Sequence, residues 1–241
     1  CSNHQSERDT GADARDGIFQ LGAVVGEMCT LFLSVPYDSP KLAERPSLDD
    51  DPFWLEPSAG KEKLANQLGE LFLQLFRIAC VCGIDLCTSI LKKVELNGRK
   101  YPVELCKGKS EKYTNYSDHT GITTTEGQST VHSPTKSSSN AMEDTITIEG
   151  ITFLLRNFAN ERLWNRYHTP RNIALALLGE MGELAELFQW SGDEGGRSMD
   201  VEELDKIGQE IADVTIYLLR LADVCHVPLG GVAMQLLEES S

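Results

Sequence analysis

Positive charge is scarce in this chain of 241 residues, in which 22 Lys and Arg face 37 Asp and Glu for a formal net charge of −15. Proteins that bind nucleic acid present a basic face to its phosphates, so the composition argues against a nucleic-acid partner. The deficit persists from Ile146 onward, where 16 acidic and 7 basic residues leave a net charge of −9. If this part of the chain acts on phosphate groups, divalent cations have to bridge the two negative partners.

Long apolar runs and paired cysteine motifs are also missing. No apolar run approaches the ~20 residues that cross a bilayer, which predicts a soluble protein with no membrane partner. The seven cysteines form no CxxC pair, so a cysteine zinc site is not expected. Cys80, Cys82 and Cys87 lie in an apolar stretch, where buried free thiols are the simplest interpretation. These features predict an intracellular protein, with the cytoplasm as the favoured compartment.

Alternating apolar and polar positions are too few anywhere to indicate a strand, so the predicted fold is all-α. Between the helical segments, residues 108–145 are rich in Ser, Thr, Gly and Asn and have almost no apolar side chain. Such a stretch cannot bury enough surface to offset its ordering entropy, which predicts a flexible linker. The linker separates two predicted domains, residues 16–107 and residues 146–241.

The second domain shows helical periodicity from its start. Apolar residues recur at spacings of three and four over 149–166, and Pro170 favours the beginning of the next helix, over about 171–190. A third helix is predicted over 201–225. Pro228 opens a fourth, which the end of the sequence at Ser241 truncates.

The first domain repeats this order. Residues 25–33 (VGEMCTLFL) match the start of 178–187 (LGEMGELAEL), and residues 63–86 match residues 206–229 along their length. An internal repeat explains both matches, so we interpret the chain as a tandem of two copies that pack as an intramolecular pseudo-dimer. The first copy has no apolar pattern that corresponds to the predicted helix over 149–166.

Four acidic residues in the second copy suggest a metal site. Glu180 and Glu183 are three residues apart and so share a helix face, and Glu210 and Asp213 repeat this spacing on the next helix. Both pairs lie among apolar residues, where an uncompensated carboxylate is costly to bury. A hard cation such as Mg²⁺ prefers oxygen ligands and removes that cost. The alternative is an ordinary solvated acidic face.

The sequence around these acids resembles a known family. GEMGELAELFQW and EIADVTIYLLRLADVC, together with the preceding FANERLWNRYHTPRN, are similar to the MazG-like all-α nucleotide pyrophosphohydrolases, specifically the dCTP pyrophosphatase branch. The resemblance covers residues 148–239. It implies Mg²⁺-dependent hydrolysis of a (deoxy)nucleoside triphosphate to the monophosphate and pyrophosphate. It also implies helical subunits that self-associate. A catalytically inactive helical protein that binds a nucleotide or a partner is the alternative.

Carried over position by position, the resemblance makes the four acids both metal ligands and catalytic residues. It assigns a further group of aromatic and helix-junction residues to substrate binding: Trp164, His168, Arg171, Asn172, Trp190 and Tyr217. The physical case for the aromatic residues is stacking on the base, and Arg171 at a helix N-terminus can hold an anion. Packing or helix capping is the alternative for each of them.

The family also carries a Lys-x-x-x-Asn-x-x-(Arg/Lys)-Tyr-Pro ending on its last helix, which the resemblance places at the phosphates. Here this pattern occurs only in the first copy, as Lys93, Asn97, Lys100, Tyr101 and Pro102. We expect these residues to complete the site of the second copy. The alternative is that the segment only ends a helix.

The first copy has lost part of its own acid set. Glu27 aligns with Glu180, but Thr30, Gln67 and Glu70 stand where the second copy has Glu183, Glu210 and Asp213. Two acids with both spacings broken make a poor cation site. The first copy is therefore predicted to be a degenerate partner of the second.

Overall fold

The computed structural model describes residues 3–33, 58–109, 146–189 and 199–240. Every regular element in these ranges is helical, which confirms the all-α prediction for the described part of the chain. The predicted binding residue Trp190 and positions 110–145 of the predicted linker lie outside the described residues.

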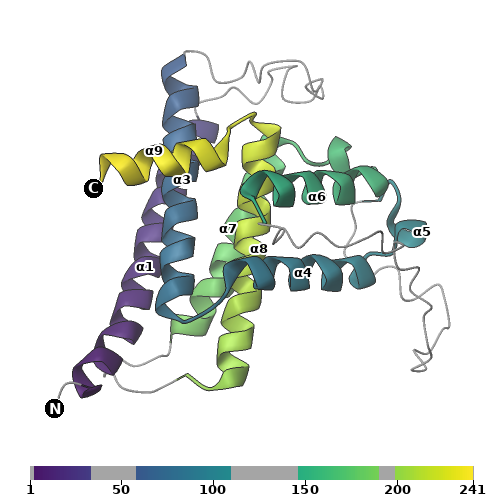
Figure 1. The fold of residues 1–241 in the computed structure, drawn as a ribbon. Helices are drawn as coiled ribbons and strands as arrows, with labels where there is room; N and C mark the ends of the chain where they lie inside the picture. Colours follow the sequence, from purple (N-terminus) through teal and green to yellow (C-terminus); the bar gives the residue numbers. More distant parts are fainter. Residues whose placement is uncertain (1–2, 34–57, 110–145, 190–198, 241) are drawn as a thin grey trace, which may run out of the picture.

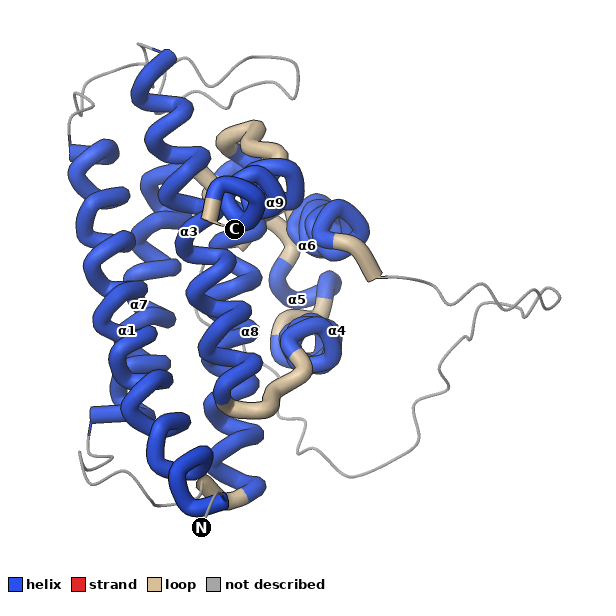
Figure 2. The backbone as a smooth tube through the Cα atoms, turned by 60° about the vertical axis from the view of Figure 1, so that its left-hand side comes forward, coloured by secondary structure: helices blue, strands red, loops and turns tan. Residues whose placement is uncertain are grey.

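Four long helices stand side by side (Figures 1 and 2). They are α1 (Asn3–Leu33), α3 (Ser58–Val81), α7 (Pro170–Gln189) and α8 (Val201–Val224). Shorter elements lie across or beside them: α4 (Leu86–Lys100), α5 (Val103–Cys106), α6 (Ile148–Glu161), the 3₁₀ helix η3 (Trp164–Arg166) and α9 (Leu229–Glu239). Helix α1 packs on α3 and α7, and α8 packs on both α7 and α3.

One hydrophobic core joins the two halves of the sequence. All four long helices contribute residues to it, including Leu21, Met28, Leu68, Leu75, Leu177, Leu184, Ile211 and Leu218. The two side chains named on each helix are seven residues apart, close to two helical turns, which places them along one stripe of that helix. Because the two halves bury their apolar stripes against each other, they form a single packed body.

A shorter helix of each half crosses one long helix of the other half. Helix α4 packs on α8, and α9 packs on α3. Each follows its own long helix at a sharp bend, of 102° between α3 and α4 and 105° between α8 and α9. The aligned positions Gly83 and His226 both have positive φ, of 68° and 53°. This symmetry supports the tandem interpretation.

Helix starts follow capping chemistry, and one predicted helix is shorter than expected. Asp200 and Glu203 form a capping box at the start of α8, and Thr147 caps α6 through its hydroxyl. The predicted continuous helix over 149–166 is wrong. Helix α6 ends at Glu161, and Leu163 adopts a left-handed conformation with φ 54° before η3 begins.

Helix α1 differs from the prediction in two ways. It begins at Asn3, inside a polar stretch in which the sequence analysis found no helical pattern. Its segment Ala14–Leu33 also has the length and composition to cross a membrane, with a mean hydropathy of 1.3, so the expectation that no segment was apolar enough is corrected. In the structure Leu21, Val25 and Met28 of this segment are buried in the shared core.

The two bend residues give a prediction about stability. The side chain of His226 is exposed, while its backbone adopts a conformation that glycine tolerates best. His226→Gly should therefore raise the free energy of unfolding by about 0.5–1 kcal/mol, measured by urea denaturation. Gly83→Ala at the aligned position should lower it. A less stable His226→Gly protein would contradict this account of the bend.

Candidate active site

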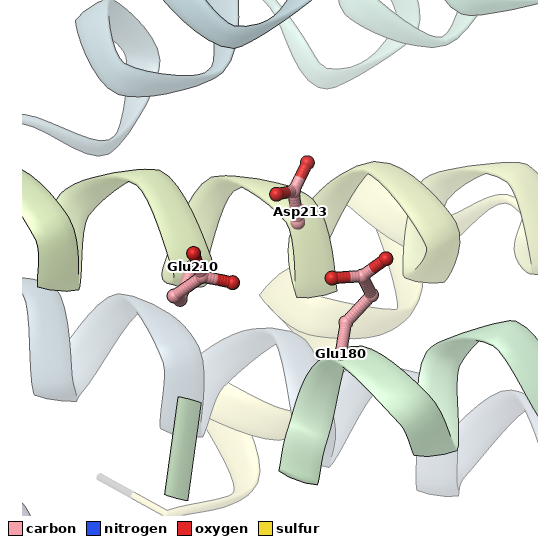
Figure 3. A group of neighbouring side chains, drawn as sticks. All are labelled: Glu180, Glu210 and Asp213. Atoms are coloured by element: carbon pink, nitrogen blue, oxygen red, sulfur yellow. The ribbon is translucent and has the colours of Figure 1, made fainter. Parts of the chain in front are cut away.

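Three carboxylates converge where α7 packs on α8. Glu180 lies on α7, and Glu210 and Asp213 lie one turn apart on α8, so that one oxygen of each is within 4.8 Å of the others (Figure 3). The spacing of three residues on α8 places its two acids on the same face. Glu183, expected as a fourth ligand, is exposed and lies outside this group of three.

The cluster is electrostatically unfavourable without a cation. Partial burial raises the pKa of Glu180 to about 7, and the negative charges of Asp213, Glu183 and Glu210 add to the effect, while Lys93 opposes it. Burial also raises the pKa of Glu210 and of Asp213. Like charges held together in partly dehydrated surroundings favour protonation or a bound cation.

A divalent cation fits this group of oxygens. Oε2 of Glu210 is buried and has no hydrogen-bond partner among the described residues. A buried acceptor without a partner is costly, and a cation would satisfy it. The ligand atoms offered by Glu180, Glu210 and Asp213 are all carboxylate oxygens, the donor type that hard divalent cations prefer.

Helix α4, from the first half of the chain, brings positive charge to the acids. Lys93 forms an ion pair with Asp213 in which both side chains are more than four-fifths buried. Lys100 lies close enough to lower the pKa of both Glu210 and Asp213. Asn97 lies between the two lysines on the same helix face, at spacings of four and three residues.

An aromatic corner adjoins the acids. The ring of Tyr101 meets that of Trp164 edge-on at a centroid distance of 5.2 Å, and His168 lies 6.2 Å from Trp164. Tyr217 lies near both the acids and the aromatic corner. Its pKa is raised to about 12, first by burial and then by its neighbours Glu180 and Tyr101. Trp164 is therefore related to the acids through Tyr101.

Arg162 fastens the end of α4 to the second half and was not anticipated from the sequence. Its Nε donates to the carbonyl of Tyr101 at 2.8 Å, and its Nη1 donates to the carbonyl of Phe158 at 3.0 Å. The backbone N–H of Gly108 donates to the carbonyl of Arg162 at 2.8 Å, and the indole N–H of Trp164 donates to Lys109 at 2.8 Å. The first two residues of the predicted linker are thus part of the packed structure.

Two predicted binding residues make structural contacts with the backbone. Arg171 donates from Nη2 to the carbonyl of Phe32 at 2.7 Å, at the end of α1. The side chain of Asn172 donates to the carbonyl of Tyr167 at 3.0 Å, and its backbone N–H donates to Thr169 Oγ1 at 3.3 Å. For both residues, these contacts match the alternative of packing or helix capping.

A buried charged group extends the acidic face of α8. Glu210, Asp213, Tyr217 and Arg220 follow one another at spacings of three and four, so they share a face. Arg220 is only 5% exposed, and its Nη1 donates to Asp223. Arg220 was not among the residues predicted from the sequence, although it is a charged residue in an apolar stripe, the same signal that indicated the acids.

Known proteins resemble part of this chain. The dCTP pyrophosphatase 1 of Rattus norvegicus and of Mus musculus are each 49% identical to it over 85 residues, and that of Homo sapiens is 48% identical over 85 residues. The alignments cover 34% of this chain and 50% of each relative, so the chain spans about half the length of the curated relatives it matches. No family model matches. The resemblance to the dCTP pyrophosphatase branch is confirmed over this stretch.

The aligned positions of the first half form no comparable acid group within the described residues. Nε2 of Gln67 donates to Glu27 at 3.5 Å, Thr30 bonds the backbone carbonyl of Glu27, and Glu70 is exposed. Gly69 allows α9 to approach so closely that a Cβ there would lie 2.7 Å from Leu236. An apolar side chain thus packs against α3 close to these positions.

The raised pKa of Glu180 gives a prediction for the metal-free protein. A carboxyl with a raised folded-state pKa contributes stability that is full below its unfolded value of 4.5 and is lost as the pH rises through about 7. Glu180→Gln removes this loss. It should stabilise the protein at pH 8 by on the order of 1 kcal/mol, after allowance for solvent screening, and by much less at pH 5.

Urea denaturation in a chelating buffer at both pH values measures this difference. Glu186→Gln, an exposed substitution on the same helix, is the matched control and should keep the pH dependence of the parent protein, because it leaves Glu180 in place. Equal stability of Glu180→Gln and the parent protein at pH 8 would contradict the repulsion derived from the geometry.

Proposed function

We propose that this chain hydrolyses deoxynucleoside triphosphates, with dCTP-type substrates preferred, to the monophosphate and pyrophosphate in a Mg²⁺-dependent reaction. The main support is the convergence of Glu180, Glu210 and Asp213 beside two lysines of α4, in a chain with a stretch 48–49% identical to dCTP pyrophosphatases. This reaction would serve to clean the nucleotide pool. A site for an anionic substrate needs positive charge near its carboxylates, and α4 supplies it.

The residues of the proposed site would have two roles, to hold the metal and to bind the phosphates. Mg²⁺, when bound, would supply Lewis-acid stabilisation of the charge that develops on the phosphates. Glu180, Glu210 and Asp213 would hold it, with Glu183 as a further acid at the edge. Lys93 and Lys100 would contact phosphate oxygens, and Asn97 would add a neutral donor between them.

The aromatic corner would hold the nucleobase. Trp164 meets Tyr101 edge-on, and Tyr217 lies near Tyr101 and Glu180. Stacking on aromatic side chains is a common way to bind a base. Tyr101 comes from the first half of the chain and Trp164 from the second. The base site would therefore be shared between the halves.

We further propose that residues 16–107 are a degenerate copy that completes the catalytic copy at 146–241, as a pseudo-dimer within one chain. The crossing of α4 over α8 supports this arrangement. The same proposal includes self-association beyond this chain, an intracellular location, and the absence of nucleic-acid and membrane partners. The net charge of −15 supports the exclusion of nucleic acid.

Pyrophosphate release from a panel of triphosphates tests the reaction. Activity should require Mg²⁺ and disappear with chelator, and Asp213→Asn should lower kcat by more than tenfold, or about 1.4 kcal/mol of barrier. The matched control is Glu70→Gln, at the aligned and exposed position of the first half, which should keep the parent rate. No hydrolysis of any triphosphate by the parent would favour the inactive binding protein instead.

The contribution of α4 has its own test. Lys93→Ala combined with Asn97→Ala should raise KM or lower kcat by about tenfold, because the triphosphate loses charge-assisted contacts next to the acids. Lys92→Ala is the matched control, since Lys92 is the adjacent exposed lysine and pairs with Asp205 at 2.6 Å. Unchanged kinetics in the double variant, with helicity and Tm also unchanged, would show that α4 serves only as packing.

A further inference from the structure

Arg220 is a buried cation that contacts Asp223, Asn165 and His168. Its Nη1 donates to Asp223, which also accepts from Arg156 of α6. Its Nη2 lies 3.4 Å from the amide oxygen of Asn165 and 3.4 Å from Nδ1 of His168. The guanidinium is thus fixed by Asp223 on one side and faces the imidazole on the other.

The chemistry of arginine decides the protonation of that imidazole. A guanidinium has only donors, so the nitrogen of His168 that it faces must act as an acceptor. The imidazole proton is then carried by Nε2. Burial lowers the pKa of His168 to about 4, and the charge of Arg220 adds to this effect, so the ring is neutral near pH 7.

His168 lies where it can contact a base. Its ring lies next to Trp164 in the aromatic corner, and the contact with Arg220 is at Nδ1, while Nε2 makes no hydrogen bond within the described residues. The Nε2–H group is therefore available as a donor. Arg220 lies on the same face of α8 as Tyr217 and Asp213, which connects it to the proposed site.

We propose that Arg220 is a positioning residue that fixes the Nε2–H tautomer of His168, so that His168 donates a hydrogen bond to an acceptor atom on the nucleobase. This inference rests on the proposed function and names a source of its base preference. Ring nitrogen N3 of cytosine is an acceptor, whereas N3 of thymine and uracil carries a hydrogen. The Nε2–H group of a neutral His168 can donate to N3 of cytosine. With thymine, the same group would face the N3–H donor, and no hydrogen bond could form.

The tautomer of His168 can be measured directly, with no assay of activity. In the full chain with ¹⁵N-labelled histidine, long-range ¹H–¹⁵N correlation should show His168 as Nε2–H, unchanged from pH 8 to pH 5.5. In Arg220→Met, the pKa of His168 should rise, while burial still holds it below the ordinary histidine value of about 6.5. Arg220→Lys, which keeps a donor-only cation, should restore much of the parent behaviour. A proton on Nδ1 in the parent, or an unchanged titration in Arg220→Met, would overturn the proposal.

The base preference is measured on the same proteins by the ratio of kcat/KM for dCTP to that for dTTP. Arg220→Met should lower this ratio about fivefold or more, the value of roughly one hydrogen bond, and Arg220→Lys should lower it less. A ratio that stays at the parent value in Arg220→Met overturns the role of Arg220 while the proposed reaction stands. A parent that hydrolyses neither nucleotide overturns the proposed function instead.

A second pair of variants covers the case in which Arg220→Met does not fold. His168→Gln keeps an N–H donor near the position of Nε2, and His168→Leu removes it. The dCTP preference should survive better in His168→Gln than in His168→Leu, with both proteins matching the parent in helicity. Equal preference in the two variants would overturn the proposal.

Discussion

The burial of several carboxylates at the interface between α7 and α8 is the constraint on which the site depends. Glu180, Glu210 and Asp213 converge where the helices pack, and burial together with mutual repulsion raises the pKa of all three. Their charge has to be compensated, and Lys93 of α4 is placed to do this against Asp213. The crossing of α4 over α8 therefore has an electrostatic reason as well as an apolar one.

Helix α8 organises the rest of the site through one face. The face begins with the acids, continues with Tyr217 beside the aromatic corner, and ends at Arg220 behind His168. A helix with its remaining faces in the shared core can hold such groups rigidly, because packing fixes its rotation. The proposed metal ligands, the proposed base-binding tyrosine and the arginine proposed to position His168 thus lie along one helix.

Much of this arrangement was predictable because it depends on short-range spacing. The repeat of acids at i and i+3 on two apolar helices predicted the convergence of Glu180, Glu210 and Asp213, although Glu183 lies outside their group. Apolar periodicity predicted α7 and α8 to within one residue at each end. The break after α6 was not predictable in this way. The left-handed Leu163 interrupts an otherwise helical pattern, while Arg162 makes contacts with residues far away in the sequence.

The sequence by itself determined the helical class, because helix faces follow from local periodicity. It also indicated a cation site, because several carboxylates on one helix face need positive charge to compensate them. Only the tertiary structure decided which groups meet them. Lys93 lies on one half of the chain and Asp213 on the other, and Arg220 of α8 meets His168 in the short segment between η3 and α7. Such pairs carry no fixed sequence spacing, since their distance depends on how the helices cross in the folded core.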